Sequence, residues 1–448
     1  MEKVLIANRG EIALRVVRAC REMGLASVVV YSSADADSAA VRAADEAIHI
    51  GPAPAARSYL HIPNVIGAAL KTGADAIHPG YGFLSEDPDF AEICADHGIT
   101  FIGPRPEVME AVADKAAARR LMADAGLPLL PGTTSAVTTL DAARAVADEI
   151  GYPLIIKAAA GGGGRGMAIV ERPADLERAY QATRAAARAV FKNSAVYIER
   201  YLPAARHVEV QVVCDEHGGG VHLGERDCSV QRRHQKLIEE APSVSVDDAL
   251  RAEMGTAAVT GALAIGYTGV GTMEFLLDAE GRFTFMELNT RIQVEHPVTE
   301  MVAGIDIVKE QIRVAAGEPL SVAQDDVTLT GHAIECRINA EDPDAGFAPA
   351  PGVLETYVPP HGPWTRVDSH SYPGWAVSPH YDPLIAKVIV WGATRDESLD
   401  RMQRALDEFR VDGPGVKTNL DFHRRVLAHP AFRAGSHATD FVDQHLAA

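Results

Sequence analysis

A run of four glycines, Gly161 to Gly164, separates two short apolar segments that have the composition of β-strands. A Walker-type phosphate loop needs a Gly-Lys-Ser or Gly-Lys-Thr sequence that opens a helix, but here Gly166 and Met167 open the second strand. A glycine-rich turn between two strands can instead close over phosphate oxygens, because no Cβ atom shields its N–H groups. Lys157, near the end of the first strand, adds a point charge that can reach a phosphate. The alternative is a plain hairpin tip, although four glycines lose more conformational entropy on folding than such a tip requires.

Short apolar runs alternate with helical patterns over residues 3–103. Strands are expected at residues 3–7, 27–31, 74–78 and 100–103. Between the first two strands, apolar residues recur at helical spacing from Ile12 to Met23, and Gly24 ends the helix. This alternation predicts an open parallel sheet, in which ligands lie at the carboxyl ends of the strands. Residues 8–11 and 78–82 occupy two such ends, and the sequence contains no G-x-G-x-x-G motif of a dinucleotide site.

The rest of the chain changes character twice. Residues 107–151 have the pattern of alanine-rich helices, and a long helix is expected over residues 175–191. From His207 the pattern is rich in strands, and the last third mixes strands with a helix near residues 396–409. Domains usually have roughly 100–200 residues, so a chain of 448 residues predicts about three domains or one large multi-lobed unit.

The composition excludes several kinds of partner. A net charge of −19 argues against nucleic acid or an anionic membrane, so any anionic substrate needs a local cluster of cations. The five cysteines are scattered and lack C-x-x-C spacing, which predicts neither a disulfide framework nor a zinc site. The first residues show no signal-peptide pattern, and no stretch approaches ~18 apolar residues, so we expect a cytoplasmic protein that does not span a membrane.

Two glutamates are expected to face each other on one hairpin. With a four-residue loop, Asp278 pairs with Phe283. Counting back from that pair places Glu274 opposite Glu287. Directly opposed like charges among apolar neighbours destabilise a strand pair unless a cation lies between them. Asn289 lies on the same face, and carboxylates with an amide oxygen suit Mg²⁺ or Mn²⁺; two solvated edge glutamates are the alternative.

Positive charge gathers in one segment of this acidic protein. Residues 226–236 hold three arginines, a histidine and a lysine, and Arg291 and Arg337 lie in polar runs between apolar strands. Clustered cations bind small anions such as phosphate and bicarbonate, although a basic run taken alone is more often a solvated face. Cys228 is expected to be a packed small residue rather than a nucleophile. In residues 207–212, strict alternation predicts a strand whose polar face points to solvent or a cleft, with an ordinary edge strand as the alternative.

Taken together, these motifs resemble those of the ATP-grasp ligases and, within them, the biotin carboxylases. The resemblance lies in residues 6–15, 78–86, Lys157 with the glycine run, 226–236, 287–297 and 335–343, which occur in the family's order. It implies an α/β ATP-grasp fold. The expected parts are an N-terminal open parallel-sheet, Rossmann-like domain (1–113), an ATP-grasp domain (114–330) with a small glycine-loop lid at about 130–203, and a mixed α+β C-terminal domain (331–446).

The resemblance also implies roles for single residues. The nucleotide is expected to contact Lys115, Lys157, Gly163, Gly164, Glu199, Arg200, Tyr201, Leu202, His207, Gln231, His234, Glu274 and Glu287. Metal ions are expected at Glu274, Glu287 and Asn289, and bicarbonate at Lys236, Arg291, Gln293, Val294 and Arg337. The expected catalytic residues are Glu295 as general base with Lys236, Arg291 and Arg337, and biotin is expected to contact Arg337 and Tyr81.

The implied activity is ATP-dependent carboxylation of biotin. Bicarbonate attacks the γ-phosphate of ATP in the presence of two Mg²⁺ or Mn²⁺ ions, the carboxyphosphate yields CO₂, and biotin captures it. No Ala-Met-Lys-Met biotin-attachment sequence is present, so the biotin carboxyl carrier protein and the carboxyltransferase are expected on separate chains. Acetyl-CoA, for fatty acid biosynthesis, is the expected final acceptor, and propionyl-CoA or another acyl-CoA is the alternative. Matches at Arg18, Glu22 and Arg366 to positions near the family's dimer contact predict a homodimer.

Two other functions stay open. Another bicarbonate-using ATP-grasp ligase, such as half of a carbamoyl-phosphate synthetase, would come from an internally duplicated chain, and no repeat is visible here. A regulatory subunit that only binds nucleotide would not need the opposed Glu274 and Glu287 together with Glu295 and Arg337. Bicarbonate-stimulated ATP hydrolysis would separate the regulatory subunit from the two enzymes.

Overall fold

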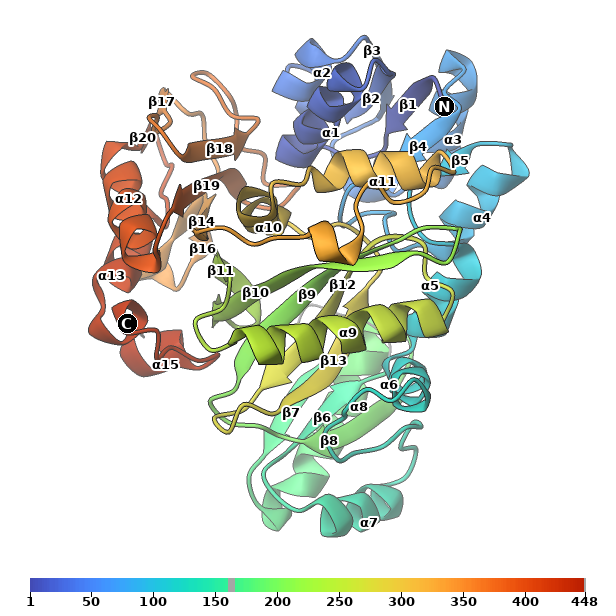
Figure 1. Cartoon of the computed structure of the whole chain (residues 1–448), viewed down its shortest axis with the longest axis vertical. Helices are drawn as coiled ribbons and strands as arrows, with labels where there is room; N and C mark the ends of the chain where they lie inside the picture. The colour runs from blue at the N-terminus through green and yellow to red at the C-terminus, as the bar shows by residue number, and fades with distance from the viewer. Residues whose placement is uncertain (160–165, 447–448) are drawn as a thin grey trace.

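The computed structural model describes residues 1–159 and 166–446, and its N-terminal part contains an open sheet (Figure 1). The strand order is β3-β2-β1-β4-β5 and the neighbouring strands are parallel, which confirms the predicted sheet. The elements are β1 (Lys3–Ile6), α1 (Gly10–Glu22), β2 (Ala26–Ser32), α2 (Ala39–Ala43), β3 (Glu46–Gly51), α3 (Ile62–Thr72), β4 (Ala76–His78), α4 (Pro88–Asp96) and β5 (Thr100–Phe101). Strand β3 escapes the sequence pattern, because this edge strand buries only one of its residues fully.

The loops after β1 and β4 pack against each other, because these two strands are neighbours in the sheet. The Asn8 side chain donates hydrogen bonds of 2.7 Å to the carbonyl oxygens of Pro79 and Tyr81. Gly80 has a φ of 64°, and a Cβ atom there would come within 2.8 Å of Asn8 Nδ2. At the end of the sheet where ligands are expected, the loops after β1 and β4 are therefore closely packed against each other.

A small antiparallel sheet with the order β7-β6-β8 projects from the body, at the bottom of Figure 1. Its elements are α7 (Leu140–Ile150), β6 (Leu154–Ala158), β7 (Met167–Val170), α8 (Leu176–Phe191) and β8 (Val196–Arg200). Strands β6 and β7 pair from Leu154 with Val170 to Lys157 with Met167, so the glycine run connects two antiparallel strands, as predicted. The turn, with Gly163 and Gly164, lies outside the described residues.

One large antiparallel sheet, of order β13-β12-β9-β10-β11-β14-β19-β18, carries most of the remaining chain. Its strands are β9 (Arg206–Cys214), β10 (Gly220–Arg232), β11 (Gln235–Ala241), β12 (Gly269–Leu277), β13 (Phe283–Asn289), β14 (His332–Asn339), β18 (Thr365–Ser369) and β19 (Leu384–Gly392). The pairing of β11 with β14 joins the strand-rich middle of the chain to its last third. A single sheet therefore runs through both, which the sequence pattern does not show.

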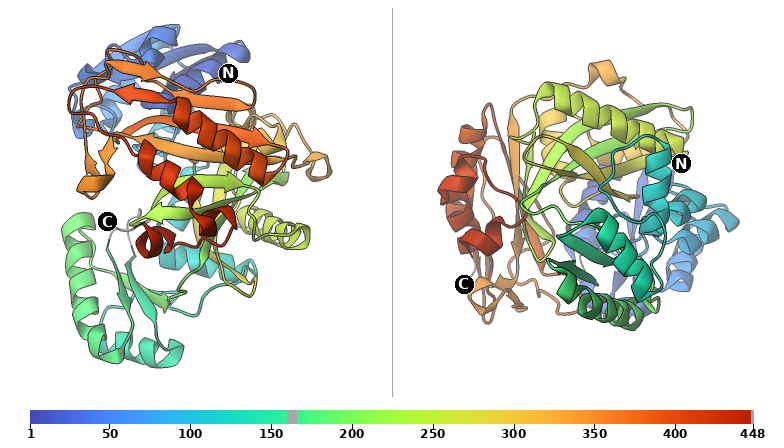
Figure 2. Two further views of the ribbon diagram at one scale, coloured as in Figure 1. Left: turned by 90° about the vertical axis from the view of Figure 1, so that its left-hand side faces the viewer. Right: turned by 90° about the horizontal axis from the view of Figure 1, so that it is seen from below.

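The two faces of this large sheet differ in character. On one face Val208, Val210 and Val212 of β9 pack in an apolar core with α9 (Asp248–Ala264), and Cys336 of β14 packs in a second core with α12 (Arg395–Glu408). Figures 1 and 2 show these two helices beside the sheet. Side chains alternate along a strand, so Glu209 and Arg337 point to the other face. Helix α10 (His296–Ala303) contacts β10, β11, β14 and β19.

The hairpin of β12 and β13 corrects one predicted pair. Leu277 pairs with Phe283, and Asp278 belongs to the turn. A β-bulge further along the hairpin then shifts the register by one residue and places Glu274 opposite Glu287, as predicted. The expected pair is right although the expected turn is wrong, because a residue inserted in one strand cannot be recognised by counting from the turn.

The remaining elements are shorter or lie at the periphery. They are α5 (Pro106–Ala113), α6 (Lys115–Asp124), α11 (Ile307–Ala315), β15 (Glu341–Asp342), β16 (Ala348–Pro349), β17 (Thr356–Val358), β20 (Arg410–Asp412), α13 (Leu420–Ala428), α14 (Pro430–Arg433) and α15 (Phe441–His445). The five cysteines are buried and free, as their spacing predicts. Within the described ranges, no helix has the length and apolar character needed to cross a membrane.

The connection between α14 and α15 contacts the large sheet through the side chain of His437. Its Nε2 atom lies 3.3 Å from Glu240 Oε1 and 3.6 Å from Asp227 Oδ1, and all three side chains are buried. Burial alone would lower the pKa of His437, but the two carboxylates outweigh it and raise the pKa to about 9. Because the folded pKa lies above the unfolded one, the stabilisation is complete below roughly pH 6.5 and is lost as the pH rises through about 9.

We expect the free energy of unfolding of the wild-type protein to fall by about 2–3 kcal/mol more than that of the His437→Gln variant between roughly pH 7 and pH 10. Denaturant unfolding at a series of pH values measures this difference. His97→Gln, a change at an exposed histidine of the N-terminal part, is the control and should follow the wild-type curve. If the free energy of unfolding depended on pH in the same way for the wild type and the His437 variant, His437 would not have the raised pKa.

Candidate active site

Strand β9 carries three polar side chains on the inner face of the large sheet. His207, Glu209 and Gln211 are buried, while the intervening valines enter the apolar core. The strand pairs with β10 on one side and β12 on the other, so the edge-strand alternative is wrong. The predicted polar face of this strand is confirmed, and its side chains point to a buried region that contains several charged residues.

Arg226 of β10 organises part of that interior, although the sequence suggested only a basic run. Its guanidinium is fully buried and donates to Glu209 Oε1 at 2.6 Å and to Gln211 Oε1 at 2.8 Å. Two hydroxyls, those of Thr299 and Thr272, accept further bonds of 3.0 and 3.2 Å. A buried guanidinium is tolerated only when its donors are used in this way. Arg226 therefore sets the geometry of Glu209 and cannot serve as a solvated surface charge.

Lys236 of β11 is the central cation of the site. Its Nζ atom lies 2.5 Å from Glu209 Oε2, 2.6 Å from Glu295 Oε1 and 3.0 Å from Glu274 Oε1. Burial alone would lower the pKa of Lys236, but the three carboxylates outweigh it and raise the pKa well above its usual value. The ammonium stays charged and draws three glutamates from different strands and loops to one point.

Glu295 lies between two cations at the start of α10. It is fully buried, and its second oxygen, Oε2, is 2.9 Å from Arg337 Nη2. Burial acts to raise the pKa of Glu295, but the charges of Lys236 and Arg337 prevail and hold it well below the usual range. Glu295 is therefore an ionised carboxylate, which is the protonation state a general base needs. Arg337 also contacts Glu239 Oε1, at 2.5 Å, so it is shared between two acids.

The three residues predicted to bind metal ions lie together on the β12–β13 hairpin. Glu274 Oε2 is 2.9 Å from His207 Nε2, and Asn289 Nδ2 donates to Glu274 Oε1 at 2.9 Å. Glu287, opposite Glu274, forms an ion pair with Lys115. Two carboxylates and an amide oxygen form the donor set that Mg²⁺ prefers, and the opposed charges are now neutralised by Lys115, His207 and Lys236. The chemistry of these residues thus fits a divalent cation with phosphate.

The segment before Glu295 collects the residues expected to hold an anion. Arg291 donates from Nε to Glu86 Oε2 at 2.9 Å and from Nη1 to Gln293 Oε1 at 2.9 Å. Gln293 in turn donates to Glu274 Oε1 at 3.1 Å. Arg291 also donates from Nη2 to Asn289 Oδ1 at 3.2 Å, so the side chains of Arg291 and Gln293 both reach the β12–β13 hairpin, and Val294 follows them directly. Glu86, an unpredicted partner, comes from the N-terminal domain.

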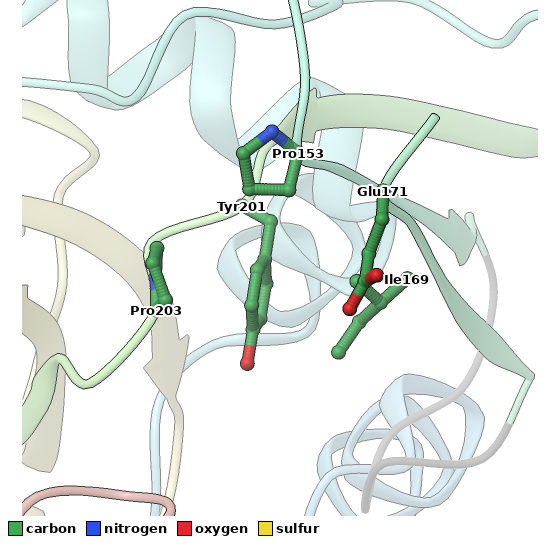
Figure 3. A pocket seen from close by; sticks show the side chains of 5 residues that line it. All are labelled: Pro153, Ile169, Glu171, Tyr201 and Pro203. Atoms are coloured by element: carbon green, nitrogen blue, oxygen red, sulfur yellow. The ribbon is translucent and has the colours of Figure 1, made fainter. Parts of the chain in front are cut away.

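A cavity of about 280 Å³ opens beside the small sheet, lined by Pro153, Ile169, Glu171, Tyr201 and Pro203 (Figure 3). In the figure the Tyr201 ring stands between Pro203 on one side and Ile169 and Glu171 on the other. An aromatic ring with apolar neighbours is a suitable surface for a flat base. Of the expected nucleotide residues, Tyr201 lines this cavity.

Several other expected nucleotide residues belong to the small sheet or to segments that follow it in the chain. Lys157 forms an ion pair with Glu199, which also receives a bond of 2.8 Å from Arg119, an arginine that sequence reasoning missed. The Arg200 side chain binds the carbonyl oxygen of Ile150, and Leu202 follows Tyr201 in the connection to β9. Gln231 ends the buried part of β10, and His234 lies in the tight turn to β11 with a φ of 65°.

Tyr81, the residue expected at biotin, follows β4 at the ligand end of the N-terminal sheet. Its hydroxyl donates to Glu11 Oε1. Burial and the Glu11 charge raise the pKa of Tyr81 well above its usual value, and the positive charge of Arg337 opposes them. The phenol therefore stays protonated, and the N-terminal sheet and the Arg337 region meet at this residue.

Three family models match the chain in order, and their descriptions agree with this arrangement. "Biotin carboxylase, N-terminal domain" matches residues 1–109, "carbamoyl-phosphate synthase L chain, ATP binding domain" matches residues 114–323, and "biotin carboxylase C-terminal domain" matches residues 335–444. The two flanking models favour the biotin carboxylases over the carbamoyl-phosphate synthetase alternative.

Full-length relatives give the same result. A biotin carboxylase of Nostoc sp. is 54% identical over 443 residues, which are 99% of each chain. The crystal structure of a Campylobacter jejuni biotin carboxylase β-γ-ATP complex has a TM-score of 0.97 and 48% identity and covers 99% of both chains. The biotin carboxylase domain dimer of Hydrogenobacter thermophilus 2-oxoglutarate carboxylase, crystallised with MgADP, ADP and bicarbonate, has a TM-score of 0.96 and 46% identity over 99% of this chain and 97% of that one. The chain therefore belongs to the biotin carboxylase family of ATP-grasp proteins and is an ATP-dependent ligase that carboxylates biotin.

Proposed function

We propose that this chain forms carboxyphosphate from bicarbonate and ATP at the Lys236 cluster and passes the carboxyl group to biotin on a separate carrier protein. The observation that carries the proposal is the placement of Glu295, an ionised and fully buried carboxylate between Lys236 and Arg337. The metal-binding hairpin adjoins it, because Lys236 also contacts Glu274. The expected base Glu295, the cations Lys236 and Arg337, and the carboxylate of Glu274 thus meet within one buried site.

In the ligand-free arrangement Glu295 is a weak base, because Lys236 and Arg337 stabilise its charge. Bicarbonate is an anion and competes with Glu295 for the same cations, with Arg291 as a further donor. When Lys236 and Arg337 turn to the substrate, the negative charge of Glu295 is less stabilised and its pKa rises. The carboxylate then accepts the bicarbonate proton as the oxygen attacks the γ-phosphate, so binding itself activates the base.

On the phosphate side, Lys115 and Lys157 would supply positive charge, and Glu274, Glu287 and Asn289 would hold Mg²⁺ or Mn²⁺. Burial and the charge of Lys157 lower the pKa of His234, so this residue would meet the nucleotide as a neutral imidazole. When bound, the two divalent cations neutralise the phosphate oxygens and orient the γ-phosphate for in-line attack. On the biotin side, Arg337 would stabilise the developing ureido oxyanion, and the protonated Tyr81 would orient the ring. The adenine base would lie against Tyr201 (Figure 3).

The proposed partners follow from the chemistry and from the relatives. A relative named only as a biotin carboxylase, that of Nostoc sp., matches over 99% of each chain, which supports a carrier and a carboxyltransferase on other chains. We propose acetyl-CoA as the final acceptor, with propionyl-CoA as the alternative. Arg18, Glu22 and Arg366, expected at a dimer contact, line one open hollow of about 470 Å³, which supports the proposed homodimer.

The overall proposal is tested by ADP release from ATP and Mg²⁺, with bicarbonate and free biotin each added or omitted. We expect release to require bicarbonate and to rise with biotin, because biotin consumes the activated carboxyl group. Release that depends on bicarbonate but ignores biotin would favour a ligase with another acceptor. No dependence on bicarbonate would favour a regulatory role.

The Glu295→Gln variant should keep nucleotide affinity and lose bicarbonate-dependent turnover by roughly 10²–10⁴-fold, because an amide cannot accept the proton. Nucleotide titration and the ADP-release assay measure the two properties separately. Glu310→Gln, which also places an amide at a buried glutamate but lies in α11, controls for the effect of the change itself. Turnover near the wild-type level in the Glu295 variant would remove this residue from the role of base.

The Glu287→Gln variant should need about tenfold more Mg²⁺ for half-maximal activity, which corresponds to a loss of ~1.4 kcal/mol in cation affinity. Direct Mn²⁺ binding in the presence of ADP gives a readout that does not depend on turnover. Glu280→Gln, at an exposed position in the turn of the same hairpin, should leave both values unchanged. An unchanged Mn²⁺ affinity in the Glu287 variant would show that the hairpin carboxylates do not bind the cation.

A further inference from the structure

Lys387 of β19 is a fully buried lysine with no assigned role. Its Nζ atom donates to the carbonyl oxygen of Val294 at 2.8 Å and lies 3.0 Å from Glu11 Oε1. Asp368 Oδ2, on the neighbouring strand β18, is 4.0 Å away. The three oxygen atoms belong to segments that are far apart in sequence. One ammonium group thus joins α1, the loop before α10 and β18.

The position of Lys387 in the sheet places it beside the catalytic cluster. It is the direct cross-strand neighbour of Arg337 on β14 and of Asp368 on β18. Cross-strand neighbours point to the same face of a sheet, so Lys387 and Arg337 share the polar face. Val294, which Lys387 holds by its carbonyl group, directly precedes Glu295. Glu11, its other partner, accepts the bond from the Tyr81 hydroxyl.

The charge of Lys387 is maintained inside the protein. Burial alone would lower the pKa of Lys387, but Glu11, Glu335 and Asp368 outweigh it and raise the pKa. Glu335 has no hydrogen-bond partner on either oxygen among the described residues, and burial raises its pKa well above the usual range. Glu335 is therefore not a bonded partner of the ammonium, which bonds Val294 and Glu11. Apolar side chains of similar volume could stabilise the fold as well as such a buried charge, so its value lies in the geometry that it imposes.

We propose that Lys387 is a positioning residue for both halves of the reaction. It fixes the Val294 peptide, and through it Glu295, against Lys236 and Arg337 on the bicarbonate side. It also fixes Glu11, and through it Tyr81, on the biotin side. The bicarbonate side, at Glu295, and the biotin side, at Tyr81, are thereby held at a constant distance from each other. This inference rests on the proposed roles of Glu295 and Tyr81.

The test compares two variants that cut different contacts. Lys387→Met removes both contacts, and we expect the KM for bicarbonate to rise about tenfold or more in the ATPase assay without biotin, and stimulation by free biotin to disappear. Glu11→Gln removes the carboxylate charge that Tyr81 and Lys387 contact but leaves the bond of Lys387 to Val294, so it should weaken stimulation by biotin and leave the KM for bicarbonate near the wild-type value. Nucleotide affinity should be unchanged in both variants, because neither side chain contacts the expected nucleotide residues.

Lys3→Met is the matched control for the loss of a bonded lysine. Lys3 donates to the carbonyl oxygen of Thr72 at 2.9 Å and to Glu46 Oε1 at 2.8 Å, so it makes the same kinds of contact at the start of β1 in the N-terminal sheet. We expect its kinetic constants to match the wild type. If Lys387→Met does not fold, the double variant Glu11→Gln/Lys387→Met avoids an unpaired buried carboxylate, and it should show the bicarbonate defect that Glu11→Gln alone lacks.

Two outcomes would overturn the inference. In one, Lys387→Met lowers thermal stability but keeps the wild-type KM for bicarbonate, which assigns the residue a purely structural role. In the other, Lys387→Met and Glu11→Gln have identical kinetic effects, which would show that the bond of Lys387 to Val294 does not position Glu295. A failure of the proposed function is distinguishable, because then the wild-type protein itself shows no bicarbonate-dependent ADP release.

Discussion

The active site depends on one buried ammonium, that of Lys236, which contacts Glu209, Glu274 and Glu295. Three carboxylates cannot lie close together in a protein interior unless positive charge compensates them, because each would otherwise lose its hydration without replacement. Arg226, His207 and Arg337 extend the same compensation to the rest of the polar face. The outcome is a preorganised set of charges that an anionic substrate and divalent cations can rearrange without rebuilding the fold, which is the condition for strong electrostatic catalysis.

The large antiparallel sheet makes this concentration of charge possible. Strand side chains alternate, so a strand with valines on one face can present acids and amides on the other. The apolar face packs into cores with α9 and α12, and this burial supplies the hydrophobic stabilisation that the polar face lacks (Figure 2). Because β11 pairs with β14, the polar face continues from the β12–β13 hairpin to Arg337 and Lys387. The bicarbonate, phosphate and biotin sites that we propose would therefore share one surface.

Much of the fold was accessible from local patterns, and the errors have identifiable causes. The parallel sheet, the glycine-linked hairpin and the opposition of Glu274 and Glu287 follow from periodicity and short-range pairing, and the structure confirms them. The turn of the β12–β13 hairpin was wrong by one residue, and only a β-bulge restored the expected pair. Strand β3 has too few buried residues to leave a clear pattern. The edge-strand alternative for β9 failed because alternation records the polarity of a face and not the position of a strand in its sheet.

By itself the sequence determined the residue types of the site, their membership in short motifs and the family to which those motifs point. These properties are local, since a glycine run, a strand alternation or a pair of opposed glutamates involves residues close together in the chain. The tertiary structure decided which charges meet. Arg226 with Glu209, Arg119 with Glu199, and Lys387 with both Glu11 and Val294 are contacts between separate elements, and no periodicity links them. The neighbouring charges then decided the protonation states against the effect of burial, because the same lysine or glutamate has a different pKa in water and beside opposite charges.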